Sequence, residues 1–459
     1  MSHLIIVGGG ISGLSAAYYA RQAAPDLKIT LLEGDSRLGG KITTVAEDGF
    51  LLEGGPDATV RYKPWAVALM KELGLEGHMV GTIPARPSAL IHDGNAAQPI
   101  PPGLQTVVPG DLRAMALSPL LSPFGKARAA LDLVLPKGSE GDEPFGAFIV
   151  RRLGKQVWER LVAPLSGGIY GGDPYELSTL AAFPQLKALE QTHGSLIKGA
   201  IQQRKERGSR EAGQLFASLS RGLGSWVNAL ETQLSGVEVG LNTPVERLER
   251  VKDGWRVYTP EGSLDSDAIL ITTPGPVTAR LLEALHPEAA QALKNIPYGI
   301  SATVSFAFPK DTLPMRVGHG MLMAASAGFS VRGFTWTDQK WAGRAPEGYG
   351  LVRGYFSGVE GDENALAGLA KADLARLWGH VPEPEHTWIF CWQQGLPQYT
   401  VGHLERVQKA LEAETLPGLF LAGAAYHGVG LPEAVRMGQE KALKAVGFLR
   451  GEVPVASSY

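Results

Sequence analysis

The amino-acid sequence predicts an α/β fold, α+β when the whole chain is considered, in which a parallel sheet opens the chain. Three observations predict it. A short apolar run, 4–7, leads directly into a glycine turn and an expected helix over about 12–24. A second apolar run at 28–33 completes a strand–helix–strand unit. A third strand, turn and helix pattern at 419–449 implies that distant segments build the same domain.

The first turn carries glycines at the spacing of a phosphate-binding motif. Gly8, Gly10 and Gly13 fill the G-x-G-x-x-G positions, which allow a tight turn, close approach of the backbone to a pyrophosphate, and close packing of the helix on the strand. Ile11 and Ser12 begin the helix, so its N-terminal N–H groups and dipole face the phosphates. By itself this motif is weak evidence, because 58 of the 459 residues are glycine.

Two features after the turn indicate which dinucleotide is bound. Glu33 ends the second strand twenty positions after Gly13, where a carboxylate accepts hydrogen bonds from ribose hydroxyls and repels a 2′-phosphate. The alternative is a solvated Glu at a strand end. A second glycine pair between basic side chains follows, and the residues expected to lie along the cofactor are Gly34, Arg37, Gly39, Gly40 and Lys41. Nicotinamide dehydrogenases do not need this addition, so the prediction is FAD, and the run resembles the amine-oxidase and protoporphyrinogen-oxidase superfamily of FAD enzymes.

The composition bounds the class of protein. A chain of 459 residues is long enough for two or three domains, and a net charge of −3 disfavours a nucleic-acid partner. The single cysteine, Cys391, excludes an intrachain disulfide framework and a thiolate metal cluster, and we expect it to be a small buried hydrophobe. No metal site is expected. No apolar run reaches the roughly 18–20 residues of a spanning helix, so we expect a cytoplasmic protein, with peripheral contact with the inner face of the cell membrane as the further alternative.

The middle of the chain changes in composition. From 84 to 136 it is rich in proline and alternates loops with short apolar helical pieces at 111–117 and 125–135. Helices are expected at 145–165 and 185–206. The apolar faces of the short helical pieces between 84 and 136 could form a core or touch a membrane, and a core is the favoured interpretation. Further strands are expected at 237–239, 243–250, 255–259 and 268–272, and those of a second, mixed sheet at 299–309, 330–336 and 350–356.

These elements predict three discontinuous domains. An FAD-binding domain is expected to take residues 1–48, 211–280 and 405–459, and a substrate-binding domain residues 49–57, 160–210 and 281–404. A helical insertion is expected at 58–159, with membrane or partner contact as a further role.

Several longer runs occur in an order that resembles one group of flavoenzymes. They are Glu53–Asp57, Pro164–Asp173, Thr335–Thr337, Lys340–Trp341 with Ala345–Gly348, Pro397–His403 and Gly428–Pro432. These runs resemble bacterial porphyrinogen oxidases of the coproporphyrinogen III and protoporphyrinogen IX type, and the resemblance extends over nearly the whole chain. The resemblance implies a discontinuous, Rossmann-like FAD domain. It also implies an oxygen-dependent, six-electron oxidation of coproporphyrinogen III to coproporphyrin III in haem biosynthesis, with release of hydrogen peroxide. Protoporphyrinogen IX is the alternative substrate.

The resemblance also implies site residues. For the cofactor it adds Gly54, Gly55, Pro56, Asp57, Val245, Gly423, Val429, Gly430 and Leu431. For the substrate it suggests a wall at Ile169 and Tyr170, with Arg61 and Lys63 for propionates and Arg332 and Arg353 as weaker options. No general base is assigned, because flavin N5 accepts the hydride; His427 is an acid–base candidate, although a structural histidine is the favoured interpretation. The stretch Pro87–Leu90 lacks the propionate-binding arginine that plant and mammalian members place there, and Arg86 is nearby but not at the matching position.

Two other functions remain open from the sequence alone. An amine or carotenoid-type desaturating oxidase would share the terminal FAD motifs, and a non-catalytic flavin-binding protein would share them too. Dioxygen is the implied second substrate, and hand-over of the product to a ferrochelatase follows from the order of the pathway.

Overall fold

A parallel sheet of five strands forms the first layer of the computed structural model, which describes residues 2–105, 107–207, 215–359 and 361–452. Its strand order is β12-β2-β1-β16-β22, and every neighbouring pair is parallel. The strands are β1 (His3–Val7), β2 (Lys28–Leu32), β12 (Val237–Gly240), β16 (Ala268–Ile271) and β22 (Leu419–Leu421). The predicted α/β class and the return of distant segments to one sheet are confirmed.

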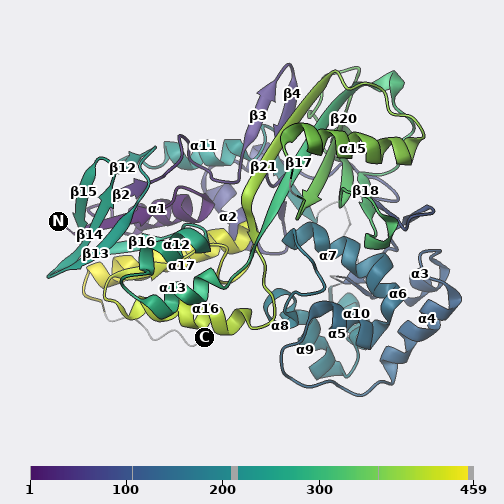
Figure 1. Ribbon diagram of the computed structural model, residues 1–459, viewed down its shortest axis with the longest axis horizontal. Helices are drawn as coiled ribbons and strands as arrows, with labels where there is room; N and C mark the ends of the chain where they lie inside the picture. Colours follow the sequence, from purple (N-terminus) through teal and green to yellow (C-terminus); the bar gives the residue numbers. More distant parts are fainter. Residues whose placement is uncertain (1, 106, 208–214, 360, 453–459) are drawn as a thin grey trace.

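Helices from both ends of the chain cover this sheet. Figure 1 shows α1 (Ile11–Ala23) beside α17 (Leu431–Leu449), and the two pack against each other. The other helices of the layer are α2 (Pro64–Glu72), α11 (Gly224–Thr232), α12 (Gly275–Leu282), α13 (Pro287–Lys294) and α16 (His403–Leu411). Ala66, Leu69 and Met70 of α2 belong to the same core as the parallel strands, so α2 is part of this layer.

An antiparallel meander connects β12 with β16. It consists of β13 (Arg247–Val251), β14 (Gly254–Thr259) and β15 (Gly262–Ser266). The strand expected at 243–250 is wrong in its first half. The chain turns after Gly240, with Asn242 at a φ of 53°, and the N–H of Thr243 donates to the carbonyl of Glu33. The exposed, polar β15 has no apolar alternation from which it could be predicted.

The second layer is a mixed sheet of seven strands in the order β21-β17-β20-β19-β18-β7-β8. Its strands are β7 (Leu90–His92), β8 (Ala97–Pro99), β17 (Tyr298–Pro309), β18 (Gly320–Met323), β19 (Gly333–Trp336), β20 (Tyr349–Ser357) and β21 (His386–Pro397). The three predicted strands of this sheet are present as β17, β19 and β20. Helix α15 (Glu363–Trp378) covers one face, where Val304, Phe306 and Phe308 of β17 lie in its core.

Short elements connect the layers. They are β3 (Thr44–Glu47) and β4 (Phe50–Glu53), which form a hairpin, β5 (Thr59–Val60) and β6 (Met79–Val80), which pair with β11 (Phe216–Leu219), the pair β9 (Leu104–Gln105) and β10 (Val108–Pro109), and α14 (Thr337–Lys340).

A helical layer with its own apolar core lies below the second sheet in Figure 1. It contains α3 (Leu112–Leu117), α4 (Pro123–Ala130), α5 (Phe145–Leu153), α6 (Lys155–Val157), α7 (Ala163–Tyr170), α8 (Thr179–Ala182), α9 (Pro184–His193) and α10 (Leu196–Arg207). Because α7 to α10 pack here and α2 does not, this layer differs in extent from the expected range 58–159.

Glycines divide the helices that the sequence analysis expected to be continuous. The helix expected at 145–165 is wrong as one element, because Gly154, at a φ of 92°, ends α5, and a π-helical turn at Trp158–Val162 precedes Pro164. The helix expected at 185–206 is likewise two helices, since Gly194 caps α9 in the left-handed region. The piece expected at 125–135 runs from Pro123 to Ala130, followed by a short 3₁₀ turn.

The helical layer has a buried ion pair and an exposed apolar edge. Arg152 donates through Nε to Asp132 at 2.6 Å, both side chains are fully buried, and Ser195 Oγ donates to the other carboxylate oxygen. The inward faces therefore form a core, as favoured from the sequence. Leu117, Phe124 and Val134 are instead exposed by 74, 88 and 79%. Within the described ranges, no helix combines the length and apolar character needed to cross a membrane.

Candidate active site

The carboxyl ends of the five parallel strands meet at one edge of the first sheet. Val7 leads into Gly8, Leu32 into Glu33, Ile271 into Thr272, and Leu421 into Ala422 and Gly423. In an open parallel sheet, ligands bind at this edge. The two glycine motifs that the sequence analysis identified at opposite ends of the chain therefore lie on the same side of one sheet.

The first glycine turn has the geometry that its spacing predicts. Gly8 has a φ of 106°, and a Cβ on Gly13 would collide with the carbonyl oxygen of Gly8. A Cβ on Gly10, in contrast, would meet no described atom within 4 Å. Gly10 thus presents bare backbone to an open space beside the N-terminus of α1, as a pyrophosphate requires.

The second glycine pair lies against this turn. The N–H of Gly39 donates to the carbonyl of Gly9 at 2.8 Å, and Gly10 and Gly39 form a parallel bridge. Gly39 and Gly40 have φ angles of 99° and 55°, which favour glycine. The two glycine runs therefore form a single cradle of backbone.

Glu33 lies at the end of the cradle. Its Oε2 accepts from the N–H of Gly9 at 2.6 Å and its Oε1 from that of Asp35 at 2.9 Å. Each oxygen keeps a lone pair for a further donor. Gly34 packs against Pro244, so the loop that contains Val245 lies beside the carboxylate.

The two basic residues of the cradle differ in their surroundings. Arg37 donates to the carbonyls of Gly40 and Ile42 and to Thr43 Oγ1, at 2.5, 3.1 and 2.5 Å, so its guanidinium holds the loop in shape. Lys41 is half-buried, no described residue accepts from it or pairs with it, and desolvation lowers its pKa. A partly desolvated cation without a protein counter-charge fits an anionic ligand such as a diphosphate.

Two helix N-termini point to the same region. Gly10 and Gly430 are the N-caps of α1 and α17 and have no side chain with which to cap them. The helices can approach closely because a Cβ on Gly438 would collide with the carbonyl of Ser12. The open cradle, the lone Lys41 and the uncapped helices together fit the diphosphate of FAD.

The loop Gly54–Asp57 is held by the second sheet. Trp392 Nε1 donates to the carbonyl of Gly54 at 2.9 Å, and Arg353 donates to that of Gly55 at 2.6 Å. Asp57 forms an ion pair with Lys340 at 2.7 Å and accepts from Trp341 Nε1 at 3.1 Å. Burial alone would raise the pKa of Asp57, but the charges of Lys340 and Arg353 hold it far below its usual value. The Asp57 carboxylate therefore anchors this loop.

The run Pro397–His403 connects the C-terminal glycine loop with the helical layer. The hydroxyl of Tyr399 donates to the carbonyl of Ala424 at 2.6 Å and accepts from the N–H of Gly428 at 2.8 Å. Gln398 Nε2 donates to the carbonyl of Tyr170 at 2.7 Å. Tyr399 is buried, which raises its pKa, and it stacks on His403 with ring centroids 3.8 Å apart.

The expected substrate residues occupy different surroundings. Tyr170 is buried and donates to the carbonyl of Ala182 at 3.1 Å. Ile169 lies in α7, but its side chain is outside the described part of the structure. Arg61 donates through Nε to the carbonyl of Phe216 at 3.1 Å, and Lys63 forms an ion pair with Glu433.

The two arginines of the second sheet differ in burial. Arg353 is 3% exposed and holds Gly55. Arg332 is half-buried, and its guanidinium has no partner among the described residues. His427 lies at the C-terminal loop, where burial together with the charges of Arg436 and Lys441 lowers its pKa.

The face of the second sheet that meets the Gly54 loop carries polar groups. Thr303 pairs in register with Tyr355 and Phe390, and Ser357 with Ser301. Opposite residues of an antiparallel pair share a face. On this face Thr303 Oγ1, Ser357 Oγ and Arg353 Nε are buried without a hydrogen-bond partner in the described ranges, as expected where a bound molecule completes the site.

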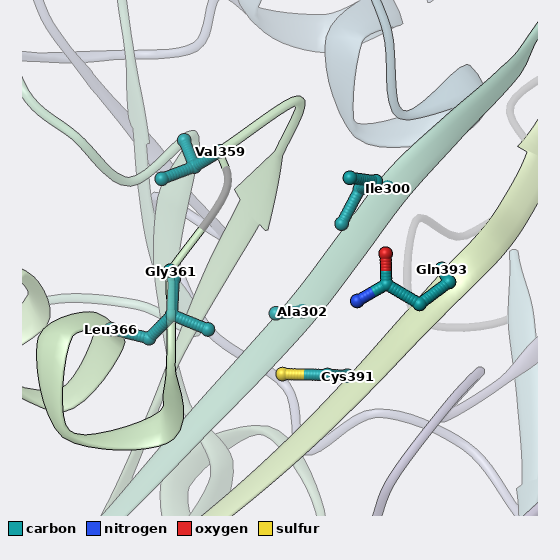
Figure 2. Close-up of a pocket in the computed structure, with 7 residues that line it drawn as sticks. All are labelled: Ile300, Ala302, Val359, Gly361, Leu366, Cys391 and Gln393. Carbon is teal, nitrogen blue, oxygen red and sulfur yellow. The ribbon is translucent and has the colours of Figure 1, made fainter.

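A separate pocket of about 330 Å³ lies on the opposite, α15-facing side of this sheet. Figure 2 shows its lining, with Cys391 and Gln393 of β21, Ile300 and Ala302 of β17, and Val359, Gly361 and Leu366. The expectation that Cys391 is buried is wrong: β21 is an edge strand, and the thiol is exposed. None of the expected site residues lines this pocket.

Several residues of the site lacked a predicted role. Lys340, Trp341, Trp392, Gln398, Tyr399 and Glu433 all contact the predicted loops. Most lie in or next to the runs that carry the family resemblance, which is the signal that could have identified them. Their partners are about 30 to 370 positions away, so the contacts themselves were not visible in the sequence. No group of His, Cys, Asp and Glu among the described residues could hold a metal ion.

Known proteins resemble this chain over nearly its whole length. Residues 11–444 match the family of flavin containing amine oxidoreductases. A coproporphyrinogen III oxidase from Bacillus subtilis is 35% identical over 97% of this chain and 98% of its own, and the chloroplastic protoporphyrinogen oxidase of Nicotiana tabacum is 31% identical over 97% and 85%. A solved Exiguobacterium structure is 37% identical, with a TM-score of 0.86 and coverage of 97% and 98%.

A more distant likeness supports the fold. Cyclohexylamine oxidase from Brevibacterium oxydans superposes with a TM-score of 0.70 at 17% identity, over 98% of this chain and 99% of its own. The FAD predicted from the glycine motifs and Glu33 is confirmed by the family match. The chain belongs to the flavin containing amine oxidoreductase family, groups within it with the porphyrinogen oxidases, and is an FAD-dependent oxidoreductase.

Proposed function

We propose that this enzyme oxidises coproporphyrinogen III to coproporphyrin III, with dioxygen as electron acceptor and hydrogen peroxide as second product. The observation that carries the proposal is the position of the Gly54–Asp57 loop. It lies against the end of the second glycine run, where the N–H of Gly54 donates to the carbonyl of Thr43 at 2.7 Å. Trp392, Arg353 and Lys340 hold it against the polar face of the second sheet. The identity of 35% to the Bacillus subtilis relative, over nearly the whole of both chains, supports the choice of substrate.

We assign the ends of the cofactor from the same geometry. Glu33, Gly34 and Val245 would hold the adenosine end, and the cradle of Gly8–Gly13 with Gly39–Lys41 the diphosphate. Gly54–Asp57, Gly423 and Val429–Leu431 would surround the isoalloxazine ring. When bound, FAD supplies the oxidising power, taking two electrons in each of three rounds.

The residues of the chain itself position the substrate and exclude water. Tyr170, Tyr399 and Phe183 form a buried aromatic cluster at the end of α7, which suits the edge of an apolar macrocycle. The unpartnered hydroxyls of Thr303 and Ser357 suit pyrrole N–H donors on the opposite side. No general base is assigned, since these groups position the ring rather than accept its protons.

The cationic side chains without a partner among the described residues would bind the propionates. Coproporphyrinogen III has four propionates and protoporphyrinogen IX has two, so the number of accessible cations decides between them. Arg61 and Arg332 have terminal guanidinium nitrogens without a described partner, whereas Lys63 and Arg353 are already engaged. Protoporphyrinogen IX remains the second candidate, which the tobacco relative favours.

The proposal extends to the cellular setting. The exposed free thiol of Cys391 fits a reducing, cytoplasmic compartment, and the exposed Leu117, Phe124 and Val134 fit peripheral contact with a membrane. The porphyrin product would pass to a ferrochelatase. Flotation with anionic vesicles, compared between the native protein and Phe124→Ser, tests the membrane contact.

The function is tested with anaerobically prepared porphyrinogens. Purified holoenzyme is mixed in air with coproporphyrinogen III, protoporphyrinogen IX, cyclohexylamine or phytoene, and porphyrin fluorescence and peroxide are followed. We expect kcat/KM to be at least tenfold higher for coproporphyrinogen III than for protoporphyrinogen IX. Porphyrin formation no faster than without enzyme would refute the proposal, and a reversed ratio would select the second candidate.

A further inference from the structure

An ion pair joins two segments that border the expected flavin ring. Lys63, immediately before α2, contacts Glu433 in the first turn of α17, across 370 positions of the chain. The Glu433 side chain is only 10% exposed, while that of Lys63 is 39% exposed. Helices α2 and α17 pack against each other in the first layer (Figure 1), which brings the two residues together.

The carboxylate of Glu433 lies directly on the C-terminal glycine loop. A Cβ on Gly428 would collide with the methylenes of Glu433, and a Cβ on Gly430 would lie 2.7 Å from its Oε2. The charge also reaches the neighbouring tyrosines: after burial, Glu433 is among the causes that raise the pKa of Tyr170 and Tyr399. Glu433 therefore lies where the loop, α7 and the expected ring meet.

The sign of the charge at this place matters for electron uptake. Reduction adds electron density to a bound flavin, and the N-terminus of α17 favours that added charge. A lone carboxylate on the same turn would oppose it, and in a partly desolvated site the opposition is stronger than in water. The ammonium of Lys63 neutralises that carboxylate.

We propose that the Lys63–Glu433 pair sets the reduction potential of the bound FAD and so the ease with which substrate electrons enter it. The inference rests on the placement of the isoalloxazine ring in the proposed function, but not on the identity of the substrate. It gives Lys63 a role other than that of a propionate ligand. The pair acts on the cofactor electrostatically: the carboxylate of Glu433 lowers the reduction potential and the ammonium of Lys63 raises it.

The test measures the midpoint potential of bound FAD without any porphyrinogen, by titration against a reference dye. Lys63→Met exposes the ring to an unpaired carboxylate, and we expect the equilibrium constant for reduction to fall about tenfold, which is about 30 mV for a two-electron couple. Glu433→Gln leaves the ammonium alone and should raise the constant by a similar factor. The double variant and Lys63→Arg should stay within about threefold of the native value.

A second ion pair on α17 is the matched control. Arg436 and Glu440 pair across one turn, with side chains 26 and 51% exposed, so Glu440→Gln should leave the potential unchanged. Single variants that shift the potential in the same direction, or by less than twofold, overturn the proposal. A merely structural clamp predicts lower thermal midpoints with a native potential. A propionate ligand predicts a raised KM in Lys63→Met, again with a native potential. Failure to oxidise porphyrinogens would refute the proposed function without affecting this result.

Discussion

Replacing Tyr399 with phenylalanine removes a single oxygen from the centre of the site. That oxygen donates to the carbonyl of Ala424 and accepts from the N–H of Gly428, at 2.6 and 2.8 Å. The ring is 1% exposed and stacks on His403, and phenylalanine preserves both the volume and the stack. The variant therefore isolates two hydrogen bonds without creating a cavity.

The magnitude follows from the groups left behind. A buried donor or acceptor without a partner costs about 1–3 kcal/mol, so two such groups lower the free energy of unfolding by about 2–4 kcal/mol after some relaxation. If the freed loop relaxes in the apoprotein and becomes ordered only when FAD binds, part of the lost stability appears as a less favourable free energy of FAD binding. At 1.4 kcal/mol per factor of ten, we expect the Kd for FAD to rise about tenfold or more.

The assay combines urea unfolding of the apoprotein with a fluorescence titration of FAD. Tyr170→Phe is the control, because it removes one hydrogen bond, to the carbonyl of Ala182 at 3.1 Å, and should lower stability by about 1 kcal/mol with little change in FAD affinity. A Tyr399→Phe protein with native stability and native Kd would show that the hydroxyl does not hold the C-terminal loop.

Three further predictions follow from the site and its surroundings. Gly10→Ala should unfold like the native apoprotein, because its Cβ enters open space, and yet bind FAD at least tenfold more weakly in the same titration. Gly13→Ala should destabilise the apoprotein itself, because its Cβ collides with the backbone of the turn. Asp57→Ala should lower the free energy of unfolding at pH 7 by about 3–5 kcal/mol, since it leaves Lys340 without its counter-ion. Nearby cations hold the pKa of Asp57 far below its usual 3.8, so its contribution to the free energy of unfolding is complete above pH 3.8 and is lost progressively as the pH falls below that value. In urea unfolding, the difference between the native protein and the variant should therefore be about 1 kcal/mol smaller at pH 3 than at pH 7; a constant difference would contradict the pairing. Burial, with the charges of Arg406 and His427, lowers the pKa of His403 to about 3. Between pH 6.5 and 3 this histidine therefore binds a proton in the unfolded state but not in the folded state. The free energy of unfolding of the native protein should fall by about 2 kcal/mol between pH 7 and 5 because of this group, and His403→Gln should not show that fall.

The sequence predicted the first sheet well because its signals are local. Strands β1, β2, β16 and β22 are short, largely buried apolar runs, and β1 and β2 are followed directly by Gly8 and Glu33. The second sheet was predicted only in part. Strand β21 mostly alternates irregularly between exposed and half-buried positions and forms the edge of the sheet. Helix α15 was not predicted, although Asp362 caps its first turn and Gly379 follows its last residue. Where burial on one face is weak, periodicity does not separate strand from loop.

The helical layer shows a different limit. Its residues were recognised as helical, but Gly154 and Gly194 were not recognised as ends, because glycine inside an apolar helical pattern is compatible with either a continuous helix or a break. The buried pair of Arg152 and Asp132 was also invisible. A charged residue on a predicted helix is usually solvated, and only tertiary packing shows that this one has its partner 20 positions away.

The sequence predicted the backbone geometry of the glycine turns more completely than the partners of the charged side chains. Glycine positions report conformation and close approach, which are properties of the local chain, so Gly8, Gly13 and Gly39 have the predicted geometry. A cationic side chain reports only that charge is available. Lys63 and Lys41 read alike in the sequence, yet one faces a carboxylate of α17 and the other has no described counter-charge.

That difference separates ligand-binding cations from structural ones in this site. A buried or half-buried cation that the protein itself neutralises has little attraction left for an anionic group, whereas one without a protein partner gains most from binding it. By this criterion we propose that Lys41 would serve the diphosphate and Arg332 the propionates, while Arg353, Lys340 and Lys63 are held by partners within the protein. Substrate choice and flavin electronics would then depend on different cations, and each could change without the other.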